Sequence, residues 1–315
     1  MAQETPEIIL SLAAAYPHDP KHLDAILVPQ LAHRLRLTTL WSIAPSSRVL
    51  DIGCGQGDSA LVLSHAVAPD ATSTPGSGSG SGPAAEPGHV TALDPAPGDY
   101  GSPYTLAQSQ SYILKSERYG PRITFHQSDA PSYLASHPLE RFDSATLCHS
   151  LWYFPSRDAV AGLFDSLYSS GRIDRLCFAE YSLKATSPSQ VPHELAVEAQ
   201  RRFHSLREDR GFTLSQSNVR GALDPEELIH LAEKAGWKLH EKGAVETPGM
   251  LDGQWEVGAV LAPDWVEELT NEKLGPEAEE ELLGFVAKIR AAADELRQKG
   301  DKIATMDATW VVMQR

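Results

Sequence analysis

The chain has 315 residues, of which 42% are hydrophobic, and a formal net charge of -15 at pH 7. This composition supports a sizeable core and excludes disorder of the whole chain. The negative charge repels a phosphate backbone, which argues against nucleic acid as a partner. No stretch approaches the roughly 20 apolar residues that span a bilayer, and the N-terminus lacks the basic start of a secretory signal. We therefore expect a cytoplasmic protein without a membrane partner.

The first 44 residues predict helices, in "PEIILSLAAAY" and then in "PKHLDAILVPQLAHRLRLTTLWSI", where Pro29 should bend or break the helix. After them, short apolar segments alternate with helical ones. We expect strands over 47–53, 89–94, 122–129, 142–150 and 174–182. Strands that alternate with helices at this spacing favour a parallel sheet covered on both faces.

The second half continues this alternation with more helix. "DPEELIHLAEKAG" predicts a helix with Asp224 as its N-cap and Gly236 at its end, and "WKLHEKGAVE" predicts a strand. The period of "GQWEVGAVL", residues 253–261, is compatible with strand or helix. An acidic helical stretch over roughly 263–299 precedes a last strand, "ATWVVMQR".

A segment rich in glycine and serine, residues 70–88, separates the first two expected strands. Neighbouring parallel strands need a crossover of helix plus loop between them, so the segment lies inside that crossover. Because a long loop adds little closure entropy, we expect a flexible surface insertion in one domain over 45–315, preceded by a helical cap over 1–44. Further helical insertions are expected at about 186–220 and 262–300.

The stretch "RVLDIGCGQGDSA" carries the most information about function. Gly53, Gly55 and Gly57 follow a strand and open a helix, so a ligand can lie against bare backbone. The spacing differs from the G-x-G-x-x-G of dinucleotide-binding loops. Asp51 precedes the glycines, and a carboxylate there suits an ammonium group better than a phosphate. The alternative is a glycine-rich turn that serves a nicotinamide enzyme or close packing alone.

This stretch resembles motif I of the class I S-adenosylmethionine-dependent methyltransferases, an apolar strand followed by D-x-G-x-G-x-G. The resemblance covers roughly residues 45–245 plus the last strand. It implies an α/β fold with a Rossmann-like, seven-stranded, mostly parallel sheet, helices on both faces, and a helical cap. The cofactor would be S-adenosylmethionine and the product S-adenosylhomocysteine. Asp51 would help to hold the methionine ammonium, and Gly53, Gly55 and Gly57 would lie under the amino acid and ribose.

The same resemblance implies further cofactor contacts. Asp94 ends the second expected strand, where its carboxylate can accept both ribose hydroxyls, and Pro95 follows it. Asp129 follows the third strand and would lie near the adenine amino group, with the backbone N–H of Ala130 on a ring nitrogen. A helix N-cap is an equally favoured and compatible interpretation of Asp129.

"FDSATLCHSLWYF" resembles motif IV, the fourth strand and its exit. His149 and Ser150 would face the cofactor, and Trp152 and Tyr153 would wall the methyl-transfer pocket, unless they only pack the next helix. His149 is the first candidate for the base that removes a proton from the acceptor. Tyr153 is counted with it as a catalytic candidate.

Other candidates lie elsewhere in the chain. Glu180 and Tyr181 end the fifth expected strand on the same rim of the sheet, and Glu180 is a further catalytic candidate. Aromatic faces stabilise a positive sulfonium region, although most aromatic residues are simply core. The remaining aromatic candidates are Tyr16, Trp41 and Trp255, and the weaker histidine candidates are His193 and His204.

Three functions stay open. The first is metal-independent methyl transfer by in-line displacement to N, O or S of a small metabolite, since neither a zinc-type cluster nor a dense carboxylate set is visible. The second is methylation of a protein or peptide, against which "HSLWYF" lacks the acids of arginine-modifying relatives. The third is a protein that binds the cofactor without transferring methyl, or that uses it for other chemistry. The acceptor and the oligomeric state are not specified by these motifs.

Overall fold

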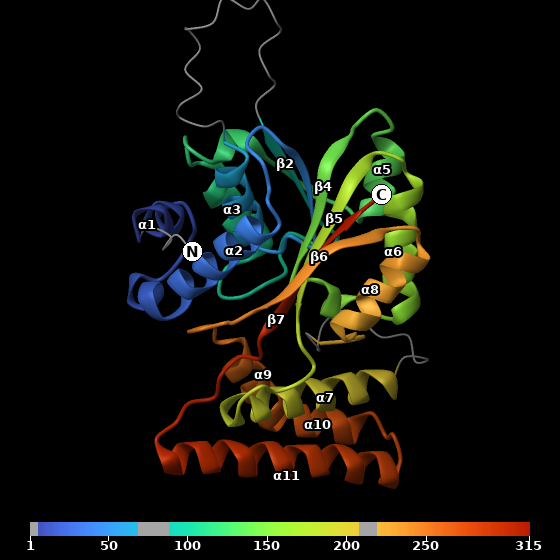
Figure 1. Cartoon of the computed structure of the whole chain (residues 1–315). Coiled ribbons are helices and arrows are strands. Elements are labelled where there is room, and N and C mark those ends of the chain that lie inside the picture. The colour runs from blue at the N-terminus through green and yellow to red at the C-terminus, as the bar shows by residue number, and fades with distance from the viewer. Residues whose placement is uncertain (1–5, 69–87, 208–218) are drawn as a thin grey trace, which may run out of the picture.

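The computed structural model describes residues 6–68, 88–207 and 219–315 (Figure 1). Its strands form one seven-stranded sheet in the order β3-β2-β1-β4-β5-β7-β6. The strands are β1 (Arg48–Ile52), β2 (His89–Asp94), β3 (Ile123–Gln127), β4 (Phe142–Cys148), β5 (Ile173–Tyr181), β6 (Lys238–Val245) and β7 (Ala308–Gln314). All pairs among β1 to β5 are parallel, and β7 is antiparallel to β5 and β6. The expected fold class is confirmed.

The strand order places a topological switch point between β1 and β4. The chain moves outward from β1 through β2 to β3 and then returns to the other side of β1 for β4, and ligands bind at such points. Helix α3 (Asp58–Ala66) and residues 69–87 connect β1 to β2. The predicted flexible insertion at 70–88 falls almost wholly outside the described residues, so its flexibility stays a prediction.

Helices cover both faces of the sheet. One hydrophobic cluster joins one face to α1 (Pro6–Ala14), α2 (Val28–Leu40), α3 and α4 (Leu106–Leu114). A second cluster joins the opposite face to α5 (Ala130–Ser136), α6 (Arg157–Ser169) and α8 (Pro225–Lys234). Figure 1 shows α2 and α3 on one side of the sheet and α6 and α8 on the other. This arrangement leaves the carboxyl ends of the parallel strands free to form a site.

Local sequence signals explain where several helices begin and end. A π-helical turn over Leu23–Leu27 leads directly into α2, and Pro29 lies in the first turn of α2. Asp224 caps α8 by accepting the N–H of Glu226 at 2.8 Å, and Gly236 has a φ of +108° just beyond the helix. The chain is not broken at Pro29; it changes from a π-helix to an α-helix just before this residue, whereas both ends of α8 agree with the sequence.

Four helices form a separate layer at one end of the sheet, below it in Figure 1. They are α7 (Val191–Ser205), α9 (Asp252–Leu261), α10 (Pro263–Asn271) and α11 (Pro276–Lys299). A third hydrophobic cluster, which includes Phe203, Trp265 and Ile289, holds them together. The ambiguous segment 253–261 is therefore helical. Within the described ranges, no helix has the length and apolar character needed to cross a bilayer.

Candidate cofactor and acceptor site

The glycine loop, residues 53–57, connects β1 to α3. Gly53, Gly55 and Gly57 have φ values of +72°, +52° and +96°, in a region that other residues rarely adopt. A Cβ at Gly53 would lie 2.6 Å from the Cβ of Ser150. At Gly55, by contrast, no atom lies within 4 Å of the place a Cβ would take. Gly55 therefore presents bare backbone beside open space, which suits a ligand that lies along the loop.

Asp51 lies beneath this loop and is only 1% exposed. Its Oδ2 accepts the hydroxyl hydrogen of Ser59 at 2.6 Å, and its Oδ1 accepts that of Thr146 at 2.9 Å. Burial raises the pKa of Asp51 to about 6, although these two hydrogen bonds oppose the shift. Asp51 thus ties the start of α3 and strand β4 to β1, and any contact with a cofactor ammonium has to use its remaining lone pairs.

Asp94 stands at the tip of β2, beside the glycine loop. Its Oδ2 accepts the N–H of Gly55 and its Oδ1 accepts the N–H of Ala96, both at 2.9 Å. A carboxylate offers about four lone-pair positions, so two positions remain for hydroxyl groups. The carbonyl of Leu93 also accepts the N–H of Gly53 at 2.8 Å. These hydrogen bonds fix the glycine loop to the tip of β2. Pro95, which follows Asp94, is exposed.

Asp129 follows β3 on the same edge of the sheet, since β3 runs parallel beside β2. Its Oδ1 accepts the backbone N–H of Ser132 at 2.8 Å, and its Oδ2 accepts the Ser132 hydroxyl at 2.9 Å. The helix N-cap interpretation is confirmed. Asp129 is exposed and Ala130 is buried; their contact with adenine stays a prediction.

Tyr16 and Gln110 support the glycine loop from outside, and the loop's own Gln56 bonds to groups beyond the loop. The Tyr16 hydroxyl donates to Oε1 of Gln56 at 3.0 Å, and Nε2 of Gln56 donates to the carbonyl of Tyr104 at 2.6 Å. Nε2 of Gln110 donates to the carbonyl of Gly55 at 2.9 Å. Tyr16 therefore lies beside the loop. The contacts of Gln56, which lies within the motif I stretch, and of Gln110 were not predicted from the sequence.

His149 leaves β4 with a φ of +53° and is 8% exposed. Its Nε2 lies 2.8 Å from Nε2 of His33 on α2, so one of these two nitrogens donates a hydrogen bond to the other. Burial, with the nearby His149 as the next cause, lowers the pKa of His33 to about 2. Nδ1 of His149 lies 3.5 Å from Oε1 of Glu180, and its ring stacks on Tyr181 with centroids 4.2 Å apart. Nε2 of this candidate base is thus engaged by His33, whereas Nδ1 lies beside Glu180 without a hydrogen-bond partner among the described residues.

Glu180 holds the turn that follows β4. It is 1% exposed, and its Oε2 accepts the backbone N–H groups of Leu151 at 3.1 Å and Trp152 at 3.3 Å. The Ser150 hydroxyl donates to the carbonyl of Ile52 at 2.9 Å, which joins the same turn to β1. Motif IV is thereby fixed against the glycine loop.

A cavity of about 60 Å³ lies between the carboxyl ends of β4 and β5 and the helices α2, α7 and α9. It brings together five residues singled out from the sequence: His149, Trp152, Tyr153, Glu180 and Tyr181. The sequence motifs did not identify Arg34, Asp252 or Glu256, which also line it, and ranked His193 low. Trp255, 48% exposed on α9, does not line it, and Trp41 is 1% exposed within the core.

Buried polar atoms without a hydrogen-bond partner among the described residues line the cavity, the Tyr181 hydroxyl and Nδ1 of His149 among them, and two of the others are N–H donors of ring side chains. These donors are Nε1 of Trp152, a residue 4% exposed, and Nε2 of His193, a residue fully buried. Nδ1 of His193 accepts the N–H of Met306 at 2.9 Å, so the ring hydrogen sits on Nε2. Burial lowers the pKa of His193 to about 4, and the ring stays neutral. Because buried donors are costly when unpaired, the cavity suits a ligand with acceptor atoms.

Two carboxyl groups face this cavity from one side of α9, one helical turn apart; Asp252 and Glu256 are called the acidic pair below. Oδ2 of Asp252 accepts from Nε2 of Gln30 at 3.0 Å, and Oε2 of Glu256 accepts from Nε2 of Gln200 at 2.6 Å. Burial, aided by the charge of Asp252, raises the pKa of Glu256 to about 7, against the effect of the Gln200 bond. Glu256 can therefore exchange a proton near neutral pH.

Comparison with known proteins identifies the family. The chain is 30% identical over 352 aligned positions to methyltransferases phomM' and phomM of Diaporthe leptostromiformis, with 95% of this chain and 87% of each relative covered. This chain is a class I S-adenosylmethionine-dependent methyltransferase. The crystal structure of a cyclopropane-fatty-acyl-phospholipid synthase-like protein from Lactobacillus casei matches with a TM-score of 0.77 at 26% identity, covering 99% of this chain and 100% of that one. No family model matches the chain.

The methyltransferase uses S-adenosylmethionine as its cofactor, as its family does. Its residues fit that group on two observations: the bare backbone of Gly55 beside open space, and the free lone pairs of Asp94 at the adjacent strand tip. In the part of the chain that is described, no group of three or more His, Cys, Asp or Glu side chains is arranged to hold a metal ion.

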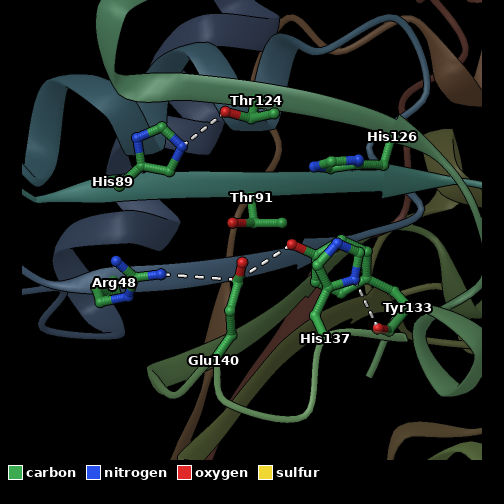
Figure 2. A pocket seen from close by; sticks show the side chains of 8 residues that line it. All are labelled: Arg48, His89, Thr91, Thr124, His126, Tyr133, His137 and Glu140. Atoms are coloured by element: carbon green, nitrogen blue, oxygen red, sulfur yellow. Dashed lines mark hydrogen bonds and ion pairs between the residues drawn. The ribbon is translucent and has the colours of Figure 1, made fainter. Parts of the chain in front are cut away.

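The methyltransferase also has a larger, shallow depression of about 410 Å³ over the amino-terminal halves of β1, β2 and β3 (Figure 2). Its polar side chains bond to one another: His89 Nε2 lies 2.9 Å from the Thr124 hydroxyl, and the Tyr133 hydroxyl donates to Glu140 at 3.1 Å. The glycine loop lies at the opposite ends of these strands. The smaller cavity, which adjoins the turn after β4, is therefore the better candidate for the acceptor.

Proposed function

We propose that the methyltransferase transfers a methyl group to N, O or S of a small metabolite bound in the cavity between β4, β5 and α9. The observation that carries this proposal is the cavity beside the motif IV turn, with unpaired buried donors in its wall. A cavity of about 60 Å³ admits a small group and not a folded polypeptide surface. Its carboxyl groups favour a polar acceptor over an acyl chain, whatever the name of the Lactobacillus casei relative suggests.

The cofactor would lie along the tips of β1, β2 and β3. Gly53, Gly55 and Gly57 would pass beneath its amino acid and ribose portions, and the free lone pairs of Asp94 would accept the ribose hydroxyls. Asp51, whose oxygens already accept two hydroxyls, would reach the ammonium group through water. Pro95, Asp129 and Ala130 would border the adenine site. His149 and Ser150 would face the cofactor beside the glycine loop.

S-adenosylmethionine, when bound, would supply an electrophilic methyl group. The acceptor would bond to the methyl carbon in line with the C–S bond, the sulfur would leave as a neutral thioether, and no metal ion would take part. The chain contributes orientation and exclusion of water, which together can supply on the order of 7–11 kcal/mol. Trp152, Tyr153 and Tyr181 would wall off solvent. Glu180 and His149 would hold the motif IV turn, since their polar atoms bond mainly to protein groups.

Labelled cofactor tests this proposal directly. The full chain is incubated with S-adenosylmethionine carrying a tritiated methyl group and with a metabolite extract, and label is then sought in low-mass and polypeptide fractions. Label in a low-mass product is expected, and Asp94→Ala should abolish it. Label confined to polypeptide would support the protein methyltransferase alternative, and bound cofactor without any transfer would overturn the proposal.

A further inference from the structure

We infer that the acceptor is an amine that enters as an ammonium group, and that the acidic pair on α9 binds it and removes one proton. This inference rests on the proposed function, because it assigns the substrate class of the same cavity. Neither carboxyl group belongs to motif I or motif IV, and both come from the helical layer that follows β6. They are therefore features of this chain and not of the common cofactor site.

The side chains of the acidic pair are held in place. Gln30 on α2 donates to Asp252, and Gln200 on α7 donates to Glu256. Each carboxyl group thus keeps lone pairs for a second donor. The two carboxyl groups lie four residues apart on one helix face and line the same cavity. Together they can accept hydrogen bonds from the N–H groups of one ammonium group.

The charges around the cavity also favour a cation. Among the described lining residues, the guanidinium of Arg34 is the permanent cation, and it is already paired with Asp58 at the start of α3. Glu180 adds a further carboxyl group. A neutral hydroxyl acceptor would leave these carboxyl groups repelling one another, whereas an ammonium group relieves that repulsion.

The remaining wall fits the rest of such an acceptor. The aromatic rings of Trp152 and Tyr181 line the cavity, with centroids 5.3 Å apart, and their faces attract a cation. The unpaired N–H groups of Trp152 and His193 can donate to an acceptor atom elsewhere on the substrate. An amine that also carries a carbonyl or carboxylate oxygen satisfies both sides of the cavity.

The groups in the cavity account for every proton and electron pair in the transfer. The carboxylate of Glu256 takes one proton from the ammonium group, and the freed nitrogen lone pair forms the new N–C bond. The C–S bond of the cofactor breaks, and its electron pair stays on sulfur as the neutral thioether. Glu256 then returns its proton to water. His149 is less suited to this role because its Nε2 is engaged by His33 and its Nδ1 is directed at Glu180.

Two cofactor analogues test the inference by binding alone. S-adenosylhomocysteine has a neutral thioether at the transfer position, whereas sinefungin has a carbon that bears an ammonium group. We expect the wild-type chain to prefer sinefungin, and Glu256→Gln to lower that preference roughly tenfold with S-adenosylhomocysteine affinity unchanged. The amide can still accept from Gln200. Glu267→Gln on α10, an exposed position, is the matched control and should leave the preference intact.

The outcomes separate the two proposals. If S-adenosylhomocysteine does not bind the wild-type chain, the proposed function fails. If it binds and Glu256→Gln leaves the preference for sinefungin unchanged, the inference fails while the proposed function stands. In the labelled extract, a methylated amine supports the inference, and a neutral methyl ether, ester or thioether overturns it.

Discussion

Replacement of Asp51 by asparagine should raise stability at neutral pH. The carboxyl group of Asp51 is 1% exposed and receives hydrogen bonds only from two neutral hydroxyls among the described side chains. Its pKa rises from 3.8 to about 6 on folding, which corresponds to a cost of about 3 kcal/mol once the group is ionised. Asparagine mimics the protonated acid in shape and carries no charge, so Asp51→Asn removes this cost.

The direction in which stability changes with pH follows from proton binding by Asp51. Between the two pKa values the folded chain holds a proton that the unfolded chain has released, so this group makes stability fall as pH rises. From pH 5 to pH 8 the loss through Asp51 should be about 1.4 kcal/mol, the rest of the cost being already present at pH 5. Glu256, whose raised pKa acts in the same direction, contributes equally to wild type and variant and cancels in the comparison.

Urea denaturation of both proteins at pH 5 and pH 8 measures the effect. The stability advantage of Asp51→Asn should grow by about 1.4 kcal/mol between the two pH values. Parallel pH dependence in the two proteins would refute the reasoning, because it would mean that Asp51 is not desolvated. The same variant should bind S-adenosylhomocysteine more weakly if Asp51 helps to hold the ammonium group.

Other predictions concern the loop, the histidine pair and pH. Gly53→Ala should lower the free energy of unfolding by about 1–3 kcal/mol, because of the positive φ and the clash with Ser150. Gly162→Ala in α6, where the new Cβ meets nothing within 4 Å, should raise it by up to about 1 kcal/mol. Equal melting temperatures of the two variants would contradict this prediction. His149→Ala should lower kcat by more than it weakens S-adenosylhomocysteine binding, and His33→Ala should do the same if the pair positions the motif IV turn. An unchanged kcat in both variants would remove that role. The preference for sinefungin should increase as pH rises through about 7, where Glu256 ionises, and a flat titration curve would exclude Glu256 as the responsive group.

The geometry of the proposed cofactor side of the site could be predicted from the sequence because its signals are local. Gly53, Gly55 and Gly57 need positive φ, and only glycine adopts it without strain. Asp94 could be placed because β1 and β2 had to be neighbours in a parallel sheet whatever lies between them. The same reasoning identified Asp129 as a helix cap, a role carried by residues within three positions.

The acceptor side could not be predicted in the same way. His33 and His149 are in contact although 116 positions separate them in the sequence, and no sequence motif around either residue predicts this contact. Glu256 lies in the segment 253–261, whose period is compatible with strand or helix, and Asp252 directly precedes that segment. In the structure α9 packs as a helix against α7, α10 and α11. This helix points Glu256 into the cavity and leaves its neighbour Trp255 48% exposed.

Calorimetric titration of S-adenosylhomocysteine into the full chain and into Asp94→Ala tests most directly whether the tips of β1 and β2 form the cofactor site. We expect saturable binding to the wild-type chain and affinity roughly 100-fold lower in the variant, since two charge-assisted hydrogen bonds to ribose would be lost. Asp99→Ala, an exposed position nearby, should bind as the wild type does. Equal affinity in wild type and Asp94→Ala, or no binding to either, would contradict the account.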